Sequence, residues 1–189
     1  MDFEVKIIEF LQAGRSPFFD AAFQVISQIG SVLGVLALCV LLLIFRRKLL
    51  GWYLFSYGFV YLFVNLLKEW VQRPRPYNAF DSISYIGDAV MDFSFPSGHV
   101  ACATAIAIFL GYFLWQQYKG KGMRTLIVTF CSAFVLLVAI SRMYLGKHYL
   151  TDVLAGFAIS AVICTIGIAL MRLYEKSRAK KKKEKANEN

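Results

Sequence analysis

Long apolar stretches dominate the hydropathy pattern of this chain, and charged residues are largely confined to the segments between them. Five stretches contain no Asp, Glu, Lys, Arg or His, namely residues 21–45, 49–67, 100–118, 125–141 and 153–171. A helix needs roughly 20 residues to cross a hydrocarbon layer of about 30 Å. Each stretch approaches that length, and the fourth reaches it if residues 142–145 complete it. The pattern therefore predicts an all-α fold, a polytopic membrane helix bundle with five spans.

The first twenty residues have a different, amphipathic pattern. Their apolar residues recur at roughly helical spacing: Phe3, Ile7, Ile8, Phe10 and Leu11. Because Asp2, Lys6 and Glu9 lie elsewhere around the helical wheel, we expect an N-terminal amphipathic interfacial helix. The N-terminus is acidic and its apolar run is interrupted by Glu4, Lys6 and Glu9, so no cleavable signal peptide is expected. A sixth span over residues 1–15 is the alternative, but it would carry three acidic residues into the membrane.

The boundaries follow from these patterns. Ser16 followed by Pro17 is typical of the N-cap and first position of a helix. We divide the chain into an interfacial segment (residues 1–20), a membrane domain (21–171) and a basic tail (172–189). With 189 residues, 58% hydrophobic and a mean hydropathy of +0.56, the chain is too apolar for a soluble domain. Its four cysteines lie inside apolar stretches at no metal-like spacing, which favours buried packing.

Positive charge is unevenly distributed along the chain. The formal net charge is +9, and fourteen of the 21 basic residues lie in residues 46–48, 119–124 and 172–189, together with only three acids. Five spans bring these segments to one side, which the positive-inside rule makes cytoplasmic. The expected location is the cell membrane, multi-pass, with a solvated cytoplasmic tail that is disordered or rests on anionic lipid. This distribution argues for a lipid bilayer and against nucleic acid as the partner.

Polar residues at the ends of the apolar stretches form three ordered blocks. Ionisable groups at such positions are costly, so they are functional candidates. The blocks are Lys68-x6-Arg75-Pro76, Pro96-Ser97-Gly98-His99 and Ser141-Arg142-x5-His148-x3-Asp152. This trio resembles the signature of the type 2 phosphatidic acid phosphatase (PAP2) superfamily, which also includes vanadium-dependent haloperoxidases. The resemblance implies an integral membrane lipid phosphatase, and the five-span topology puts its blocks on the extracytoplasmic side.

The residue types in these blocks suit phosphate binding. Phosphoryl transfer spreads charge over three oxygens, for which Lys68, Arg75 and Arg142 supply fixed positive charge. Ser97 and Gly98 open the third span, where free backbone N–H groups and the helix dipole favour an anion. Glycine there also lets the backbone come close. We expect phosphate binding at these five positions. Because the three cations would repel a divalent ion, no metal or other cofactor is expected.

The resemblance assigns catalytic roles to the two histidines and one acid. It makes His148 the nucleophile that forms a phosphohistidine, Asp152 the partner of His148, and His99 the general acid that later activates water. His148 and Asp152 are four positions apart, so the two would share a face if a helix begins by His148. A carboxylate on one imidazole nitrogen leaves the other nitrogen free to attack phosphorus. The near-neutral pKa of histidine suits these steps.

Each residue also has a structural interpretation. Alone, Lys68 or Arg142 would snorkel at the interface, and Asp152 would cap a helix. Arg73 lacks the six-residue spacing from Lys68, so we leave it as an ambiguous interfacial neighbour. Ser141 is interpreted as a packing hydroxyl. The chemical alternative is a metal site built from His99, His148, Asp152 and Asp92.

The predicted activity is hydrolysis of a membrane-anchored lipid phosphate or diphosphate that approaches sideways. Undecaprenyl diphosphate is the first choice of substrate among those of the superfamily. Phosphatidylglycerol phosphate, phosphatidic acid and the phosphates of lipid A are the other candidates. A phosphotransferase, in which an alcohol replaces water, stays open. A transporter that binds phosphate without turnover is the alternative from another class, although no ionisable residue lies mid-span to continue a path.

Overall fold

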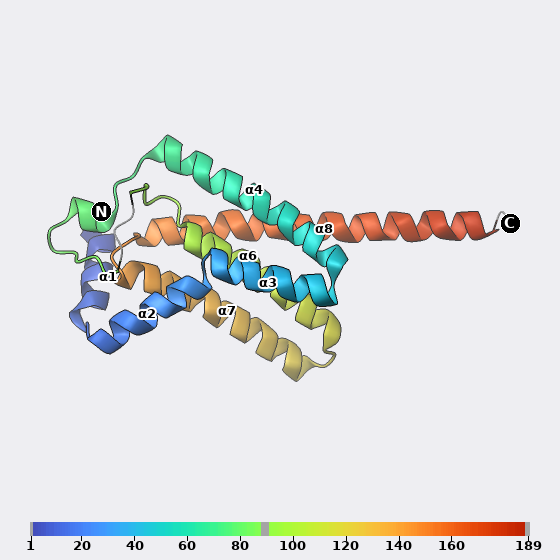
Figure 1. Ribbon diagram of the computed structural model, residues 1–189, viewed down its shortest axis with the longest axis horizontal. Coiled ribbons are helices and arrows are strands. Elements are labelled where there is room, and N and C mark those ends of the chain that lie inside the picture. The colour runs from blue at the N-terminus through green and yellow to red at the C-terminus, as the bar shows by residue number, and fades with distance from the viewer. Residues whose placement is uncertain (1, 88–90, 188–189) are drawn as a thin grey trace.

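The computed structural model describes residues 2–87 and 91–187, and over these residues the fold is all-helical (Figure 1). The helices are α1 (Asp2–Ala13), α2 (Pro17–Ile29), α3 (Val32–Phe45), α4 (Arg47–Val71), α5 (Pro76–Ala79), α6 (Gly98–Gln117), α7 (Lys121–Tyr144) and α8 (Leu150–Asn187). Residue 1 of the predicted interfacial segment and residues 188–189 of the predicted tail lie outside the described residues.

The predicted membrane bundle is confirmed. Helices α4, α6, α7 and α8 are each long and apolar enough to cross a membrane, and α2 with α3 forms a bent pair that gives the fifth span. Helix α6 lies at the centre, in contact with α3, α4, α7 and α8 (Figure 1). Its buried alanines, including Ala101 and Ala105, allow this close packing in lipid. The ends of α4 and α7 and the starts of α6 and α8 therefore meet at one end.

The first span is broken, which the uninterrupted apolar stretch 21–45 did not predict. Helices α2 and α3 are bent by 46° relative to each other at residues 30 and 31. A Cβ added at Gly30 would lie 2.7 Å from Val138 of α7, so only glycine permits this approach. The Ser31 hydroxyl then accepts a hydrogen bond from the Leu33 amide (3.3 Å) and caps α3. A Gly-Ser pair thus ends one helix and begins the next.

The N-terminal segment forms the predicted amphipathic helix. Ile8 and Val5 of α1 are buried against the bundle, whereas Phe3 and Phe10 are exposed. Helix α1 contacts α7 and α8 at the end of the bundle where α6 and α8 begin (Figure 1). Ser16 and Pro17 cap and begin α2 as expected, with the Ser16 hydroxyl 3.3 Å from the Phe19 amide. The location of α1 in the membrane interface stays a prediction.

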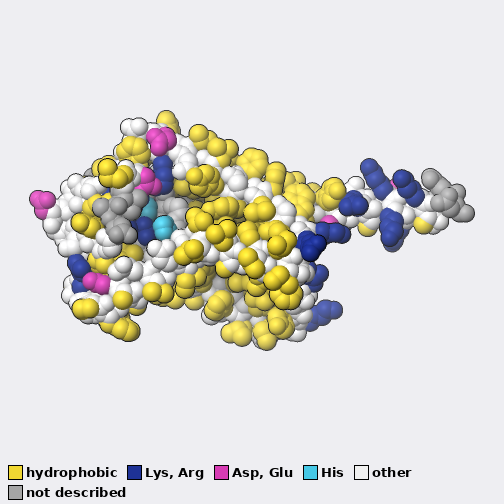
Figure 2. Space-filling view, viewed as in Figure 1, with side chains coloured by type: hydrophobic (Ala, Val, Ile, Leu, Met, Phe, Trp, Pro, Cys, Tyr) yellow, Lys and Arg dark blue, Asp and Glu magenta, His cyan; other side chains and the backbone are white. Residues whose placement is uncertain are grey.

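The tail is helical rather than disordered. Helix α8 continues to Asn187 and extends beyond the bundle, with every described residue from 172 to 187 exposed (Figure 1). Lysine, alanine and glutamate are strong helix formers, which explains the continuation. The side chains of this extension are solvated, as the sequence predicted, and Figure 2 shows its basic groups far from the opposite end of the molecule.

Candidate active site

The three sequence blocks converge at the end of the bundle covered by α1. The first block spans the last turn of α4 and the loop before α5, the second begins α6, and the third joins α7 to α8. Figure 2 shows the histidine side chains in a hollow there, beside basic and acidic groups, while hydrophobic side chains cover much of the neighbouring surface. Elements far apart in sequence therefore build one polar site at the end of an apolar bundle.

His148 is held in a defined orientation at the centre of this site. Its side chain is buried, and Nδ1 lies 2.7 Å from the Ser94 carbonyl oxygen. A carbonyl oxygen only accepts, so Nδ1 carries the proton and Nε2 keeps its lone pair. Nε2 lies 3.5 Å from Arg75 Nη1. Burial, with Arg142, Arg75 and Lys68 nearby, lowers the pKa of His148 well below its usual range, which keeps the imidazole neutral.

Asp152 pairs more closely with Arg73 than with His148. The distance from Asp152 Oδ2 to His148 Nδ1 is 3.5 Å, whereas Oδ1 accepts from Arg73 Nη1 at 2.7 Å. Oδ2 also accepts from the Tyr149 amide at 2.9 Å, as the third residue of α8 does in a capping box. The predicted pairing of His148 with Asp152 is therefore partial. The carbonyl of Ser94 orients the ring, and Asp152 contributes a nearby negative charge.

Lys68 and Arg75 both contact a carboxylate that the sequence did not assign to them. Lys68 Nζ lies 2.9 Å from Asp92 Oδ2 and donates to the Phe93 carbonyl. Arg75 Nη2 pairs with Asp92 Oδ1, and its Nε donates to the Asp92 carbonyl at 3.0 Å. Pro76 restricts Arg75 to the extended conformation that points it here. The two cations together hold one anionic group, the Asp92 carboxylate, as their shared partner.

Two buried donor atoms near these residues are Ser97 Oγ and Arg142 Nε. Neither has a hydrogen-bond partner among the described residues. Arg142 is fixed by a 2.6 Å hydrogen bond from its Nη1 to Ser27 of α2. The Ser97 amide donates to the Asp152 carbonyl at 2.9 Å, which ties the start of α6 to α8. A Cβ at Gly98 would meet Val64 at an ordinary 3.8 Å, so close approach at Gly98 stays a prediction about a bound anion. Unpartnered buried donors fit a phosphate.

His99 lines a cavity that the other histidine does not reach. It is half-buried, and together with Lys68, Asp92 and Gly98 it borders a space of about 300 Å³ between α3, α4 and α6. The remaining walls are mostly apolar, including Val60 and Val64 of α4. His99 therefore borders a largely apolar cavity at its polar end. Ser141, by contrast, donates to the Val138 carbonyl at 2.7 Å and serves packing.

The comparisons with known proteins decide the family. A profile of the PAP2 superfamily matches residues 49–176, well over half of the chain. The chain belongs to the PAP2 superfamily. A PAP2 relative, phosphatidylglycerophosphatase B of Bacillus subtilis (strain 168), is 31% identical over 157 residues, covering 79% of this chain and 73% of the relative. A lipid A 1-phosphatase of Rhizobium etli is 34% identical, covering 58% of this chain and 45% of the relative.

Solved PAP2 structures share the fold. The crystal structure of a transmembrane PAP2-type phosphatidylglycerolphosphate phosphatase from Bacillus subtilis matches with a TM-score of 0.78 at 26% identity, covering 93% of this chain and 86% of that one. Aquifex aeolicus LpxE matches with a TM-score of 0.73 at 22% identity, covering 87% and 93%. The overall fold of this chain is therefore a known architecture.

Proposed function

We propose that this PAP2 chain hydrolyses a membrane-anchored lipid phosphate through a phosphohistidine formed at His148. The observation that carries this proposal is the orientation of the imidazole. Nδ1 faces a carbonyl oxygen, so Nε2 keeps its lone pair, which accepts a long hydrogen bond of 3.5 Å from Arg75 Nη1. A fixed cation beside the nucleophile neutralises the charge that would otherwise repel attack on a phosphate dianion.

The proposed reaction has two steps. In the first, Nε2 of His148 attacks phosphorus, the bond to the lipid oxygen breaks, and His99 gives its proton to that oxygen. In the second, His99 takes a proton from water, whose oxygen attacks phosphorus and releases phosphate and free His148. Arg75, Lys68 and Arg142 stabilise the equatorial oxygens in both steps, with Ser97 and the first amides of α6 as further donors.

The cavity bordered by His99 supports sideways approach of the lipid. Its walls come from α3, α4 and α6, and its polar end is formed by Lys68, Asp92 and His99. An apolar chain lying along α4 would bring its headgroup to the polar end without leaving the bilayer. Asp92 must then leave the two cations, because a phosphate and a carboxylate would compete for the same charges.

We place the site on the extracytoplasmic side of the cell membrane. The segments rich in Lys and Arg, residues 46–48 and 119–124 and the extension of α8, lie at the opposite end of the bundle (Figure 2). The positive-inside rule makes that end cytoplasmic. We therefore expect the lipid substrate to lie in the outer leaflet of the membrane.

The named relatives bear on which lipid is used. Similarity to phosphatidylglycerophosphatase B makes phosphatidylglycerol phosphate the first candidate. Undecaprenyl diphosphate, the choice from sequence, stays in the proposal because its leaving phosphate needs little protonation. Similarity to lipid A 1-phosphatases adds a third candidate.

A panel of purified lipids tests the proposal. Phosphate release is measured from phosphatidylglycerol phosphate, undecaprenyl diphosphate, phosphatidic acid and lipid A, in EDTA because the three cations replace a metal. We expect turnover of at least one lipid, and none by His148→Ala. Transfer of the phosphoryl group to an added lipid alcohol would identify a phosphotransferase. Binding of phosphate without release from any lipid would refute hydrolysis and favour a transporter.

A further inference from the structure

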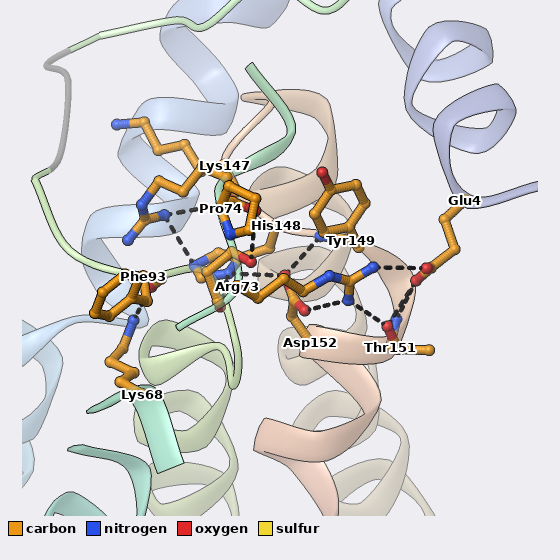
Figure 3. Close-up of polar contacts among 12 residues, drawn as sticks. Glu4, Lys68, Arg73, Pro74, Phe93, Lys147, His148, Tyr149, Thr151 and Asp152 are labelled. Atoms are coloured by element: carbon orange, nitrogen blue, oxygen red, sulfur yellow. Dashed lines mark hydrogen bonds and ion pairs between the residues drawn. The ribbon is translucent and has the colours of Figure 1, made fainter. Parts of the chain in front are cut away.

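A continuous chain of charged contacts links α1 to the candidate active site. Arg73 donates from Nη1 to Asp152 Oδ1 (2.7 Å) and from Nη2 to Glu4 Oε2 (2.8 Å), so one guanidinium bridges the two carboxylates. Figure 3 shows Arg73 between Asp152 on one side and Glu4 with Thr151 on the other. Glu4 lies outside the three sequence blocks, and Arg73 is at an unspecified position of the first block.

The burial of these groups separates the bridge from an ordinary surface ion pair. Their side chains are 16% exposed for Arg73, 14% for Glu4 and 0% for Asp152. The Arg73 guanidinium carbon also lies 3.8 Å from the centroid of the Tyr149 ring, which fixes its plane. Burial opposes the charge of Arg73, but its contacts with Glu4 and Asp152 outweigh that cost and raise the pKa of Arg73.

Glu4 acts on α8 as well as on Arg73. Its Oε1 accepts from the Thr151 amide at 2.8 Å and from the Thr151 hydroxyl at 2.7 Å, in the first turn of α8. Despite burial, these bonds and Arg73 lower the pKa of Glu4, so it is ionised at neutral pH. Glu4 therefore holds both the guanidinium that contacts Asp152 and the helical turn that carries Asp152.

We propose that Glu4 is a positioning residue of the active site, which acts through Arg73 to fix the Asp152 carboxylate beside His148. Helix α1 then belongs to the catalytic unit and is more than a membrane anchor. The inference rests on the proposed function, in which His148 attacks phosphorus. Without Glu4, Arg73 loses one of the two carboxylates between which it is clamped, and its guanidinium can turn away from Asp152.

A double-mutant cycle tests whether Glu4 acts through Arg73. Glu4→Ala should lower kcat about tenfold, the effect of one hydrogen bond to a charged group, with KM changed less than about twofold. Arg73→Met should lower kcat about a hundredfold, because the charge and three hydrogen bonds are lost, including one from Nη1 to Thr151 Oγ1 at 2.7 Å. In Arg73→Met, adding Glu4→Ala should lower kcat by a further factor of less than about two, since Glu4 can no longer act on Asp152 through Arg73. Glu9→Ala, on the same helix without a described partner, is the matched control and should match wild type.

The pH profile of kcat/KM separates positioning from a purely structural role. Arg73→Met leaves Asp152 without the cation that lies 2.7 Å from its carboxylate, so the acidic limb should move to higher pH in this variant. Arg73→Lys should keep the acidic limb at the wild-type pH but lower kcat. The positive charge remains, whereas lysine lacks the guanidinium that binds two carboxylates at once. Several charged and titratable groups surround Asp152 and His148 and stay unchanged in these variants. They are Glu4, Lys68, Arg75, Asp92, His99, Arg142 and Tyr149.

The outcomes are distinct. If the factors by which Glu4→Ala and Arg73→Met lower kcat multiply in the double variant, and the acidic limb of the pH profile does not move, the inference is overturned. Helix α1 would then be a structural element. If Arg73→Met does not fold, the same cycle with Arg73→Lys decides, because the charge that offsets Asp152 is kept. Activity retained in His148→Ala would instead show that the proposed function is wrong, whatever the cycle gives.

Discussion

The carboxylate of Asp92 occupies the two cations that the substrate phosphate needs. Lys68 and Arg75 are almost fully buried, and each contacts one oxygen of Asp92. Phosphate binding must therefore break both ion pairs. Replacing Asp92 with Asn keeps the size of the side chain but removes the negative charge that competes with the substrate.

The expected gain in anion affinity depends on the solvent exposure of Asp92, whose side chain is 49% exposed. Exposed ion pairs contribute up to about 1 kcal/mol each, and solvent screening lowers that figure. For two pairs that share one half-exposed carboxylate we take a total of about 1 kcal/mol. Because about 1.4 kcal/mol corresponds to a factor of ten, the variant should bind a phosphate-like anion roughly fivefold more tightly.

Inhibition by orthovanadate measures this binding without relying on turnover. We expect the inhibition constant of Asp92→Asn to fall roughly fivefold, whereas Asp81→Asn, an exposed acid in the same loop region, should not change it. The ion pairs of Asp92 outweigh its burial and lower its pKa below 3.8. A carboxylate with a lowered pKa loses its pairs only as the pH falls through that pKa, so the difference should persist from pH ~5 to ~8. An unchanged or raised inhibition constant with normal folding would show that Asp92 organises the cations and does not compete for them.

Three further predictions address other parts of the account. His99→Ala should still form the phosphoenzyme from p-nitrophenyl phosphate, whose leaving group needs no acid, yet fail on a lipid phosphate; equal loss on both substrates would contradict the assigned role. In a cysteine-free background, a cysteine at Asn78 should react with a membrane-impermeant thiol reagent in intact cells and one at Asn187 should not, and the reverse pattern would invert the topology. Gly156→Ala would overlap the Ser97 carbonyl oxygen and should destabilise by about 1–3 kcal/mol in thermal unfolding, whereas Gly58→Ala, with open space around it, should be neutral or stabilising.

The sequence was sufficient for the spans and for the three blocks because both depend on strong local signals. Long uncharged stretches and costly ionisable residues such as Lys68 and Arg142 stand out in an apolar chain. The break at Gly30 was missed because glycine and serine leave mean hydropathy high. Its signal was the Gly-Ser pair itself, a helix end followed by an N-cap.

The hydrogen-bond and ion-pair partners of the site residues could not be predicted from the sequence, because they depend on how loops and helices pack together. Arg73 and Arg75 lie only two positions apart in the loop after α4, yet Arg73 pairs with Asp152 and Arg75 with Asp92. Glu4 belongs to the polar face of an amphipathic helix, where a solvated acid is the usual interpretation. Its contact with Thr151 spans 147 residues of sequence, a pairing that no local pattern encodes.

Trapping the covalent intermediate tests the central claim most directly. The purified chain is mixed with a substrate carrying labelled phosphate, quenched in alkali to preserve phosphohistidine, and the labelled peptide is identified by mass spectrometry. We expect label on His148 and none in His148→Ala. With labelled p-nitrophenyl phosphate, the label should be longer-lived in His99→Ala, where water is no longer activated. Label on His99, or turnover of a lipid phosphate by His148→Ala, would contradict the central claim.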